Sequence, residues 1–171
     1  MCQRYFSKPY DTDGEIAARG KLFPAYVHAI SNAIEAASEG SKSLGREQFS
    51  QDWFDSLVHA LGEVTAPEDV LHTAARLVAV QLGGEFREHG VPQERLVLAG
   101  GGAKNKTLLK LIEELGYRDV LLSDDLGIPC EAREAMGFAV LGALSQDGVP
   151  ISLPQVTGAS SPGIAGAWVG R

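Results

Sequence analysis

Cysteine, aromatic residues and long apolar runs are all scarce in this chain of 171 residues. Only two cysteines occur, Cys2 and Cys130, and Cys2 stands at the extreme terminus, so a disulfide framework is not expected. A reducing compartment, the cytoplasm, is therefore the simpler prediction. No apolar run approaches the ~18 residues that a membrane-spanning helix needs, and the N-terminal segment lacks the apolar core of a signal peptide. Membrane spanning and secretion are both disfavoured.

A block of basic residues is also missing. The chain has 15 Lys and Arg against 22 Asp and Glu, which gives a formal net charge of −7. An acidic chain repels nucleic acid and anionic membranes, so neither is expected as a partner. Apolar residues make up 44% of the sequence, enough to bury a core. The length fits one domain, or one lobe of a larger enzyme.

Helices dominate the first half of the predicted structure. Pro9, the Asp11–Gly14 turn pattern and Gly20 indicate an irregular opening segment at residues 5–20. After it, apolar residues recur at helical spacing in three stretches. We expect helices over residues 22–37, 47–61 and 65–90.

The third of these helices has a defined start and one unusual feature. Thr65-Ala66-Pro67-Glu68 has the pattern of a capping box, so we expect the Thr65 hydroxyl to accept a backbone N–H of the first turn. Gly83 and Gly84 inside the helix cost about 1 kcal/mol each relative to alanine. Close packing of another element against this stretch would explain both glycines.

The second half alternates between strands and helices. Short apolar strands are predicted at residues 95–99 and 119–122, and helices at 103–115 and 131–146. Strand, helix, strand and helix in this order favour an α/β arrangement with parallel strands. A last strand is expected in the apolar stretch at residues 164–169.

Three consecutive glycines, Gly100, Gly101 and Gly102, separate the first strand from the next helix. Glycines at this point let the backbone approach a ligand without a Cβ in the way. The helix that follows offers free N–H groups, which suit a phosphate or the polar edge of a nucleotide. A tight turn without a ligand is the alternative. Three glycines exceed what a turn requires, so the pattern favours a nucleotide site.

Four carboxylates surround the loop at residues 127–129. Carboxylates at the end of a parallel strand and at a helix start lie where α/β proteins bind ligands, but they also suit the helix dipole, and the pattern leaves both interpretations open. The four are Asp124, Asp125, Glu131 and Glu134, of which the last two share a helix face if the helix has begun by then. The scattered histidines lack metal-ligand spacing; they are His28, His59, His72 and His89.

Six segments in order carry a resemblance to a known family. They resemble the C-terminal half of the anhydro-N-acetylmuramic acid kinase family, and fungal levoglucosan kinases are similar. The VTGA stretch at residues 156–159 favours the muramic acid branch. The segments are YDTDGEIAARGK (10–21), SKSLGREQF (41–49), LVLAGGGAKNKTLLKLIEELG (96–116), DDLGIP (124–129), EAREAMGFAVLGAL (131–144) and LPQVTGAS (153–160).

The resemblance implies a fold and an activity. The fold is α/β, the C-terminal lobe of an actin-like, sugar-kinase ATPase of RNase H-like type, with parallel strands and packed helices. Residues 1–171 would form this single lobe, with an opening segment, helix and loop (1–46), helices (47–90) and a nucleotide-binding α/β part and tail (91–171). The full enzyme uses ATP and Mg²⁺ to open 1,6-anhydro-N-acetylmuramic acid with water and phosphorylate the freed 6-oxygen, in peptidoglycan recycling. The product is N-acetylmuramic acid 6-phosphate.

The resemblance also assigns residues to the site. The nucleotide-holding segment corresponds to Gly100, Gly101, Gly102, Ala103 and Asn105. The acidic helix start nearest the sugar corresponds to Glu131 and Glu134. No catalytic or metal-binding residue is assigned in this chain.

Departures from the family pattern limit the expected activity. The family has an N-terminal lobe with a Gly-Thr-Ser phosphate loop, then a GPGN motif preceded by the expected catalytic Asp, and this sequence starts after both. Leu44 stands where the family has Thr, and Cys130-Glu131 where it has Gly-Asp. Because phosphoryl transfer needs positioned phosphates and a base, we expect the chain to be inactive alone. A separate N-terminal lobe or a homodimer are the expected protein partners.

Three other functions fit parts of the pattern. The chain could be a lobe of a levoglucosan kinase, or a nucleotide-binding or regulatory remnant without catalysis. A dinucleotide-binding enzyme of Rossmann type is the third. Gly100-x-Gly102 after a strand fits that fold, and Asp124 after the next strand could bind a ribose hydroxyl. However, Asn105 stands where the third glycine of that pattern should be.

Overall fold

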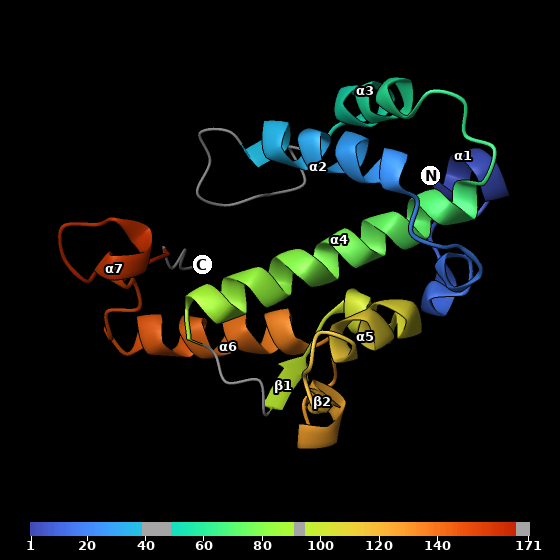
Figure 1. The fold of residues 1–171 in the computed structure, drawn as a ribbon. Coiled ribbons are helices and arrows are strands. Elements are labelled where there is room, and N and C mark those ends of the chain that lie inside the picture. The colour runs from blue at the N-terminus through green and yellow to red at the C-terminus, as the bar shows by residue number, and fades with distance from the viewer. Residues whose placement is uncertain (39–48, 91–94, 167–171) are drawn as a thin grey trace.

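The computed structural model describes residues 1–38, 49–90 and 95–166. The described part is mostly helical, with a small parallel sheet at one edge (Figure 1), and 3₁₀ turns lie at residues 12–14, 17–19, 101–104 and 123–126. The elements are α1 (Cys2–Phe6), α2 (Pro24–Ser38), α3 (Gln51–Leu61), α4 (Pro67–Glu88), β1 (Arg95–Leu98), α5 (Lys106–Glu113), β2 (Asp119–Leu122), α6 (Arg133–Gln146) and α7 (Pro154–Thr157).

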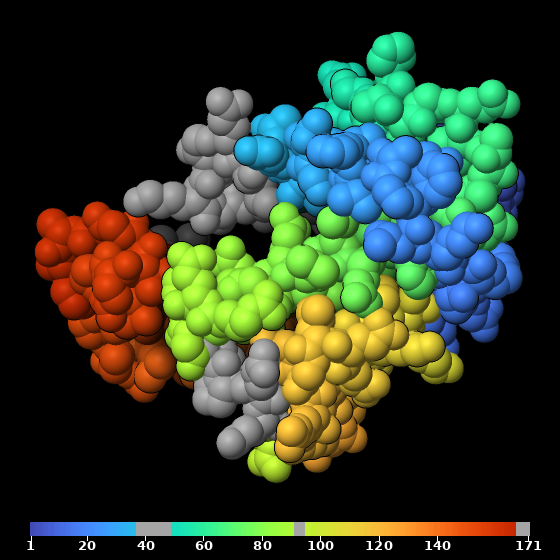
Figure 2. All heavy atoms as spheres, viewed as in Figure 1, coloured from blue at the N-terminus to red at the C-terminus, as the bar shows by residue number. Residues whose placement is uncertain are grey.

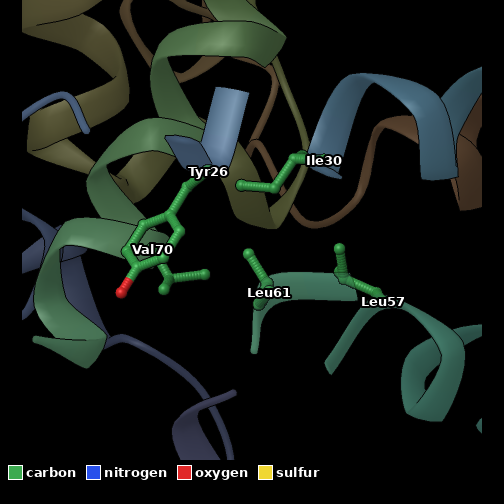
Figure 3. Close-up of a cluster of buried hydrophobic side chains, with 5 residues drawn as sticks. All are labelled: Tyr26, Ile30, Leu57, Leu61 and Val70. Atoms are coloured by element: carbon green, nitrogen blue, oxygen red, sulfur yellow. The ribbon is translucent and has the colours of Figure 1, made fainter. Parts of the chain in front are cut away.

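Helices α2, α3 and α4 enclose the first hydrophobic core. Their facing side chains form a buried cluster, drawn in Figure 3, of Tyr26, Ile30, Leu57, Leu61 and Val70. The three helices predicted in this half are confirmed. Helix α3 begins later than expected, because Ser50 Oγ accepts the Trp53 N–H at 3.2 Å and caps it there. The rest of the predicted start, residues 47–48, lies outside the described residues.

The predicted cap of α4 is wrong. The helix begins at Pro67, its N-cap is Ala66, and Thr65 makes no side-chain cap. Proline is well suited to the first helical position, since it has no N–H to satisfy there, and this shifts the cap one residue beyond Thr65. The first turn instead holds the chain directly after the opening segment, because Asp69 Oδ1 accepts the Lys21 N–H at 2.9 Å.

The second core lies between α4, α5 and the sheet. Strands β1 and β2 are parallel, with Leu96 opposite Val120, which confirms the predicted α/β arrangement. The buried cluster comprises Ala79, Leu96, Leu111, Ile112 and Tyr117. Gly83 is where α4 meets this core, because a Cβ there would lie 3.0 Å from Leu115 Cδ1. The close packing predicted at the glycine pair is therefore found at Gly83, while Gly84 borders open space.

The opening segment is less irregular than expected. Two 3₁₀ turns and the positive φ angles of Asp13 (54°) and Gly14 (74°) fit the predicted turns, but helix α1 was not predicted. Cys2 and Cys130 are both free thiols. Within residues 1–38, 49–90 and 95–166, no helix combines the length and apolar content that crossing a membrane requires.

The chain after α6 folds back on itself and projects from one end of the molecule (Figure 2). The Ile151 N–H donates to the Gly163 carbonyl at 3.0 Å, and Ser145 Oγ donates to the Ala165 carbonyl at 2.8 Å. Helix α7 was not predicted. The predicted last strand is wrong over residues 164–166, which form no strand, and its remainder lies outside the described residues.

Candidate functional site

The glycine run forms an open turn at the carboxyl end of β1. Gly100 has a φ of +88°, and its N–H donates to the Cys130 carbonyl at 2.9 Å. Gly101 and Gly102 begin a 3₁₀ turn and do not have positive φ angles. Apart from the adjoining residues of the chain, no atom of residues 1–38, 49–90 and 95–166 lies within 4 Å of the place where a Cβ would stand at any of the three glycines. Only Gly100 is required by the turn geometry, so neither packing nor torsion explains the other two glycines.

Asn105 sets the start of the helix behind this turn. Its Oδ1 accepts the Leu108 N–H at 2.9 Å, which makes Asn105 the N-cap of α5. The helix therefore begins at Lys106, and its predicted start at Ala103 is wrong. Ala103 is buried, so its side chain packs inward. Of the five residues predicted to hold the nucleotide, the structure leaves the three glycines facing outward and gives Ala103 and Asn105 supporting positions.

The opening segment clamps the same helix start. Thr107 Oγ1 donates to the Gly14 carbonyl at 2.7 Å, and Lys106 Nζ lies 3.2 Å from Asp13 Oδ2. A Cβ on Gly14 would overlap with the Asn105 carboxamide. The YDTDG segment is therefore a support for the glycine turn. Sequence reasoning recognised the segment but missed this role, since no local signal joins residues 93 positions apart.

The two aspartates after β2 shape the neighbouring loop. Asp125 Oδ2 accepts the Leu122 N–H at 2.8 Å, and Asp124 Oδ2 accepts the Cys130 N–H at 3.2 Å. Hydrogen bonding with Cys130 lowers the pKa of the Asp124 carboxyl from its usual value. Both carboxylates thus satisfy backbone donors. Among residues 1–38, 49–90 and 95–166, no group of three or more His, Cys, Asp or Glu side chains could hold a metal ion.

Cys130 joins this loop to the glycine turn, a role that sequence reasoning did not assign. Its carbonyl accepts the Gly100 N–H, and its buried thiol lies 3.4 Å from Ser123 Oγ and 3.7 Å from the Leu98 carbonyl. The only sequence signal was that the family has glycine at this position. A backbone contact of this kind depends on the packing of two loops, which residue type does not reveal.

The two predicted sugar-side glutamates are separated. Glu131 precedes α6, and its Oε1 lies 2.5 Å from Lys104 Nζ in the glycine turn. Hydrogen bonding with Glu131 raises the pKa of Lys104. Glu134 lies in the first turn of α6 and contacts its neighbour Arg133 at 3.4 Å. The predicted helix start at Glu131 is wrong, because α6 begins at Arg133, and the condition for a shared helix face is therefore not met.

Comparisons with known proteins match nearly the whole chain to one family. A family model described as anhydro-N-acetylmuramic acid kinase matches residues 1–170. A relative of that name from Streptomyces coelicolor is 39% identical over 159 residues, which cover 92% of this chain and 40% of the relative. Another from Bordetella parapertussis is 34% identical over 168 residues, or 97% of this chain and 44% of the relative. The chain thus spans less than half the length of these curated relatives.

Proposed function

This chain belongs to the anhydro-N-acetylmuramic acid kinase family, and we propose on that premise that it binds ATP as one part of such a kinase. The family expected from the six sequence segments is confirmed. The Rossmann alternative loses its support, because Asn105 caps α5 where that pattern requires a glycine.

One observation is the main support for the proposed nucleotide site. Gly101 and Gly102 stand at the carboxyl end of a parallel strand, where α/β proteins bind ligands, and no contact within the described part of the chain requires them to be glycine. A missing side chain at an open surface leaves room for a planar base or a ribose to lie against the backbone. The open turn therefore supports a ligand that contacts Gly100–Gly102 directly.

The surrounding residues have supporting roles in this proposal. Asn105 and the opening segment hold the helix start in place, and Ala103 anchors the turn from beneath. We assign the side of the site nearest the sugar to Glu131 and Glu134. Glu131 lies against the glycine turn through Lys104, and Glu134 is exposed at the start of α6.

The proposed reaction follows from the family. ATP transfers its γ-phosphoryl group to the 6-oxygen of 1,6-anhydro-N-acetylmuramic acid, water adds at the anomeric carbon as the bridge opens, and ADP leaves. The described residues do not form a metal site of their own, so no step is assigned to Mg²⁺, which would enter with the phosphates of ATP. We place this reaction in cytoplasmic peptidoglycan recycling.

Catalysis requires more than this chain in our proposal. We assign binding and positioning to its residues and the phosphate loop and general base to a complementary polypeptide, because positioned phosphates and a base are both needed for transfer. The isolated chain should therefore bind ATP weakly and show no turnover. Sustained ADP release from ATP and the anhydrosugar by the isolated chain would contradict this division.

Calorimetric titration of ATP into the 171-residue chain tests the site. Gly101→Val should abolish binding and keep the fold, because the added side chain meets open space in the folded chain but blocks the ligand. Gly84→Val is the matched control, since Gly84 also borders open space but lies in α4; it should bind ATP like the wild type.

Two results would overturn the assignment. Binding of NAD in place of ATP by the wild-type chain would return the site to the dinucleotide class. Unfolding of the Gly101→Val variant, followed by circular dichroism, would make the glycine structural and remove the main support for the site.

A further inference from the structure

Helix α6 is apolar on every side yet lies at the surface. No charged or polar side chain occurs between Ala135 and Leu144. The large side chains in this stretch are between 36% and 75% exposed; they are Met136, Phe138, Val140, Leu141 and Leu144. A helix that is hydrophobic all round normally lies in a protein interior. Helix α6 therefore has the composition of a buried helix without the cover.

The sheet beside the start of α6 is also incomplete. Leu96 and Val120 face the core with α4 and α5, whereas Val97 on the other face is 42% exposed opposite Leu121. In the described part of the chain, β1 and β2 pair only with each other. Parallel sheets are covered on both faces in nearly all proteins, and strand edges left open are sites for pairing with further strands.

A hollow beside α6 adds shape to this surface. Its volume is about 360 Å³, and its lining is mostly apolar, with Phe138, Leu141 and Ile151 among the lining residues. Ser145, at the end of α6, donates to the Ala165 carbonyl and fixes the tail that forms the far wall. The hollow is therefore suited to bind an apolar side chain of a partner.

We propose that α6 and the outer face of the β1–β2 sheet, together the α6 surface, dock the polypeptide that corresponds to the rest of a full-length kinase of this family. This inference rests on the proposed function. The relatives are more than twice as long as the matched region, which covers 40% of one and 44% of another. A partner that adds strands beside the sheet and packs on α6 would cover both bare features at once.

A second copy of this chain fits the α6 surface less well. In a two-fold dimer the same patch meets itself, so α6 would lie against its counterpart and cover one stripe. A helix exposed on all sides needs cover from more than one direction, and an α6–α6 contact would leave the outer face of the sheet bare. The observations therefore favour a partner that brings a layer of its own.

Co-expression with the part of the Streptomyces coelicolor relative that lies outside the match is the test. The 171-residue chain should form a one-to-one complex with it, measured by light scattering and by calorimetry without nucleotide. Phe138→Glu should weaken the complex by at least about 30-fold, because it would place a charge where the partner buries the Phe138 ring in the complex. Leu22→Glu is the control; Leu22 is likewise exposed (48%) but precedes α2, and its substitution should leave affinity unchanged. Hydrogen exchange should slow in α6 and β1 on binding.

Each other outcome overturns the docking surface. Equal affinities for the Phe138→Glu and Leu22→Glu variants would place the contact elsewhere, and so would protection confined to α2 and α3. Failure of the wild-type chain to bind the part of the Streptomyces coelicolor relative outside the match would contradict the proposed partner. A homodimer that Phe138→Glu dissociates would identify a second copy as the occupant. Because no nucleotide is present, these failures are distinct from a failure of ATP binding, which would contradict the proposed function alone.

Discussion

Two regions of this molecule are similarly apolar but differ in what holds them. In the clamped region, which comprises residues 5–21, α4, α5 and the sheet, side-chain contacts join residues up to 93 positions apart, such as Lys21 with Asp69 and Thr107 with Gly14. In the α6 region, residues 133–166, the contacts that hold the tail join residues that are closer in the sequence, such as Ser145 and Ala165, which are 20 positions apart. Leu111 of α5 is 4% exposed, whereas Phe138 of α6 is 75% exposed.

The difference shows that apolar content predicts a need for cover and does not supply it. Helix α5 has one apolar face, and α4 and the sheet cover it within the same chain. Helix α6 has apolar residues on all sides, and the described part of the chain leaves them at the surface. Substitutions in the clamped region should therefore change stability, whereas substitutions on α6 should change association.

The largest loss of stability is expected for Gly14→Ala. The new Cβ would overlap with the Asn105 carboxamide, and the φ of +74° is unfavourable for alanine. We expect the free energy of unfolding to fall by about 2–4 kcal/mol, measured by urea denaturation. Gly84→Ala, at an open helical position, is the control and should be neutral or slightly stabilising. Equal stabilities of the two variants would mean that the clamp contributes nothing.

Thr107→Val should cause a smaller loss in the same region. It removes the donor to the Gly14 carbonyl and leaves that buried oxygen without its partner. A buried polar group left unsatisfied costs about 1–3 kcal/mol. The double variant with Gly14→Ala should lose less than the sum of the single variants, since both disrupt one contact. Strict additivity in urea denaturation would show that the two residues act independently.

A pH effect is expected at the loop that joins the two regions. Because the folded pKa of Asp124 is lowered, the carboxylate contributes to stability above its unfolded pKa, and this contribution is lost as pH falls through the lowered folded value. In carboxyl-detected NMR, Asp124 should titrate below the ordinary pKa of an aspartate. Asp124→Asn should remove this part of the acid dependence. Titration of Asp124 at the ordinary aspartate value would contradict the Cys130 contact.

The smallest effect on the isolated chain is expected for Phe138→Ser. The side chain is mostly exposed, so its removal should change the free energy of unfolding by no more than about 0.5 kcal/mol. Leu111→Ser, at a buried position, should lower the free energy of unfolding several-fold more. Thermal unfolding of both variants would measure the contrast. A large destabilisation by Phe138→Ser would mean that α6 is covered within the chain after all.

Much of the fold could be predicted because its signals are local. Periodic apolar residues located α2, α3 and α4, and the alternation of strands and helices in the second half indicated parallel pairing. Two short helices, α1 and α7, were not predicted, the strand expected at residues 164–169 is wrong over 164–166, and two helix starts were misplaced. Thr65 and Ala103 both fit a helix beginning, but Pro67 and Asn105 determined where the helices start. Competing caps lie within a few residues of each other, and only the packed structure selects one.

Motifs and spacings were sufficient to predict the family, the order of the longer helices and the strands, and the glycine turn after β1, since these signals act within a few residues. Three features became visible only in the tertiary structure. Gly14 packs against Asn105, Glu131 precedes α6 and contacts Lys104, and Gly101 and Gly102 border open space. The tertiary structure also decided that one apolar helix is covered and another is bare. Burial depends on which surfaces meet across the whole chain, and no local pattern contains that information.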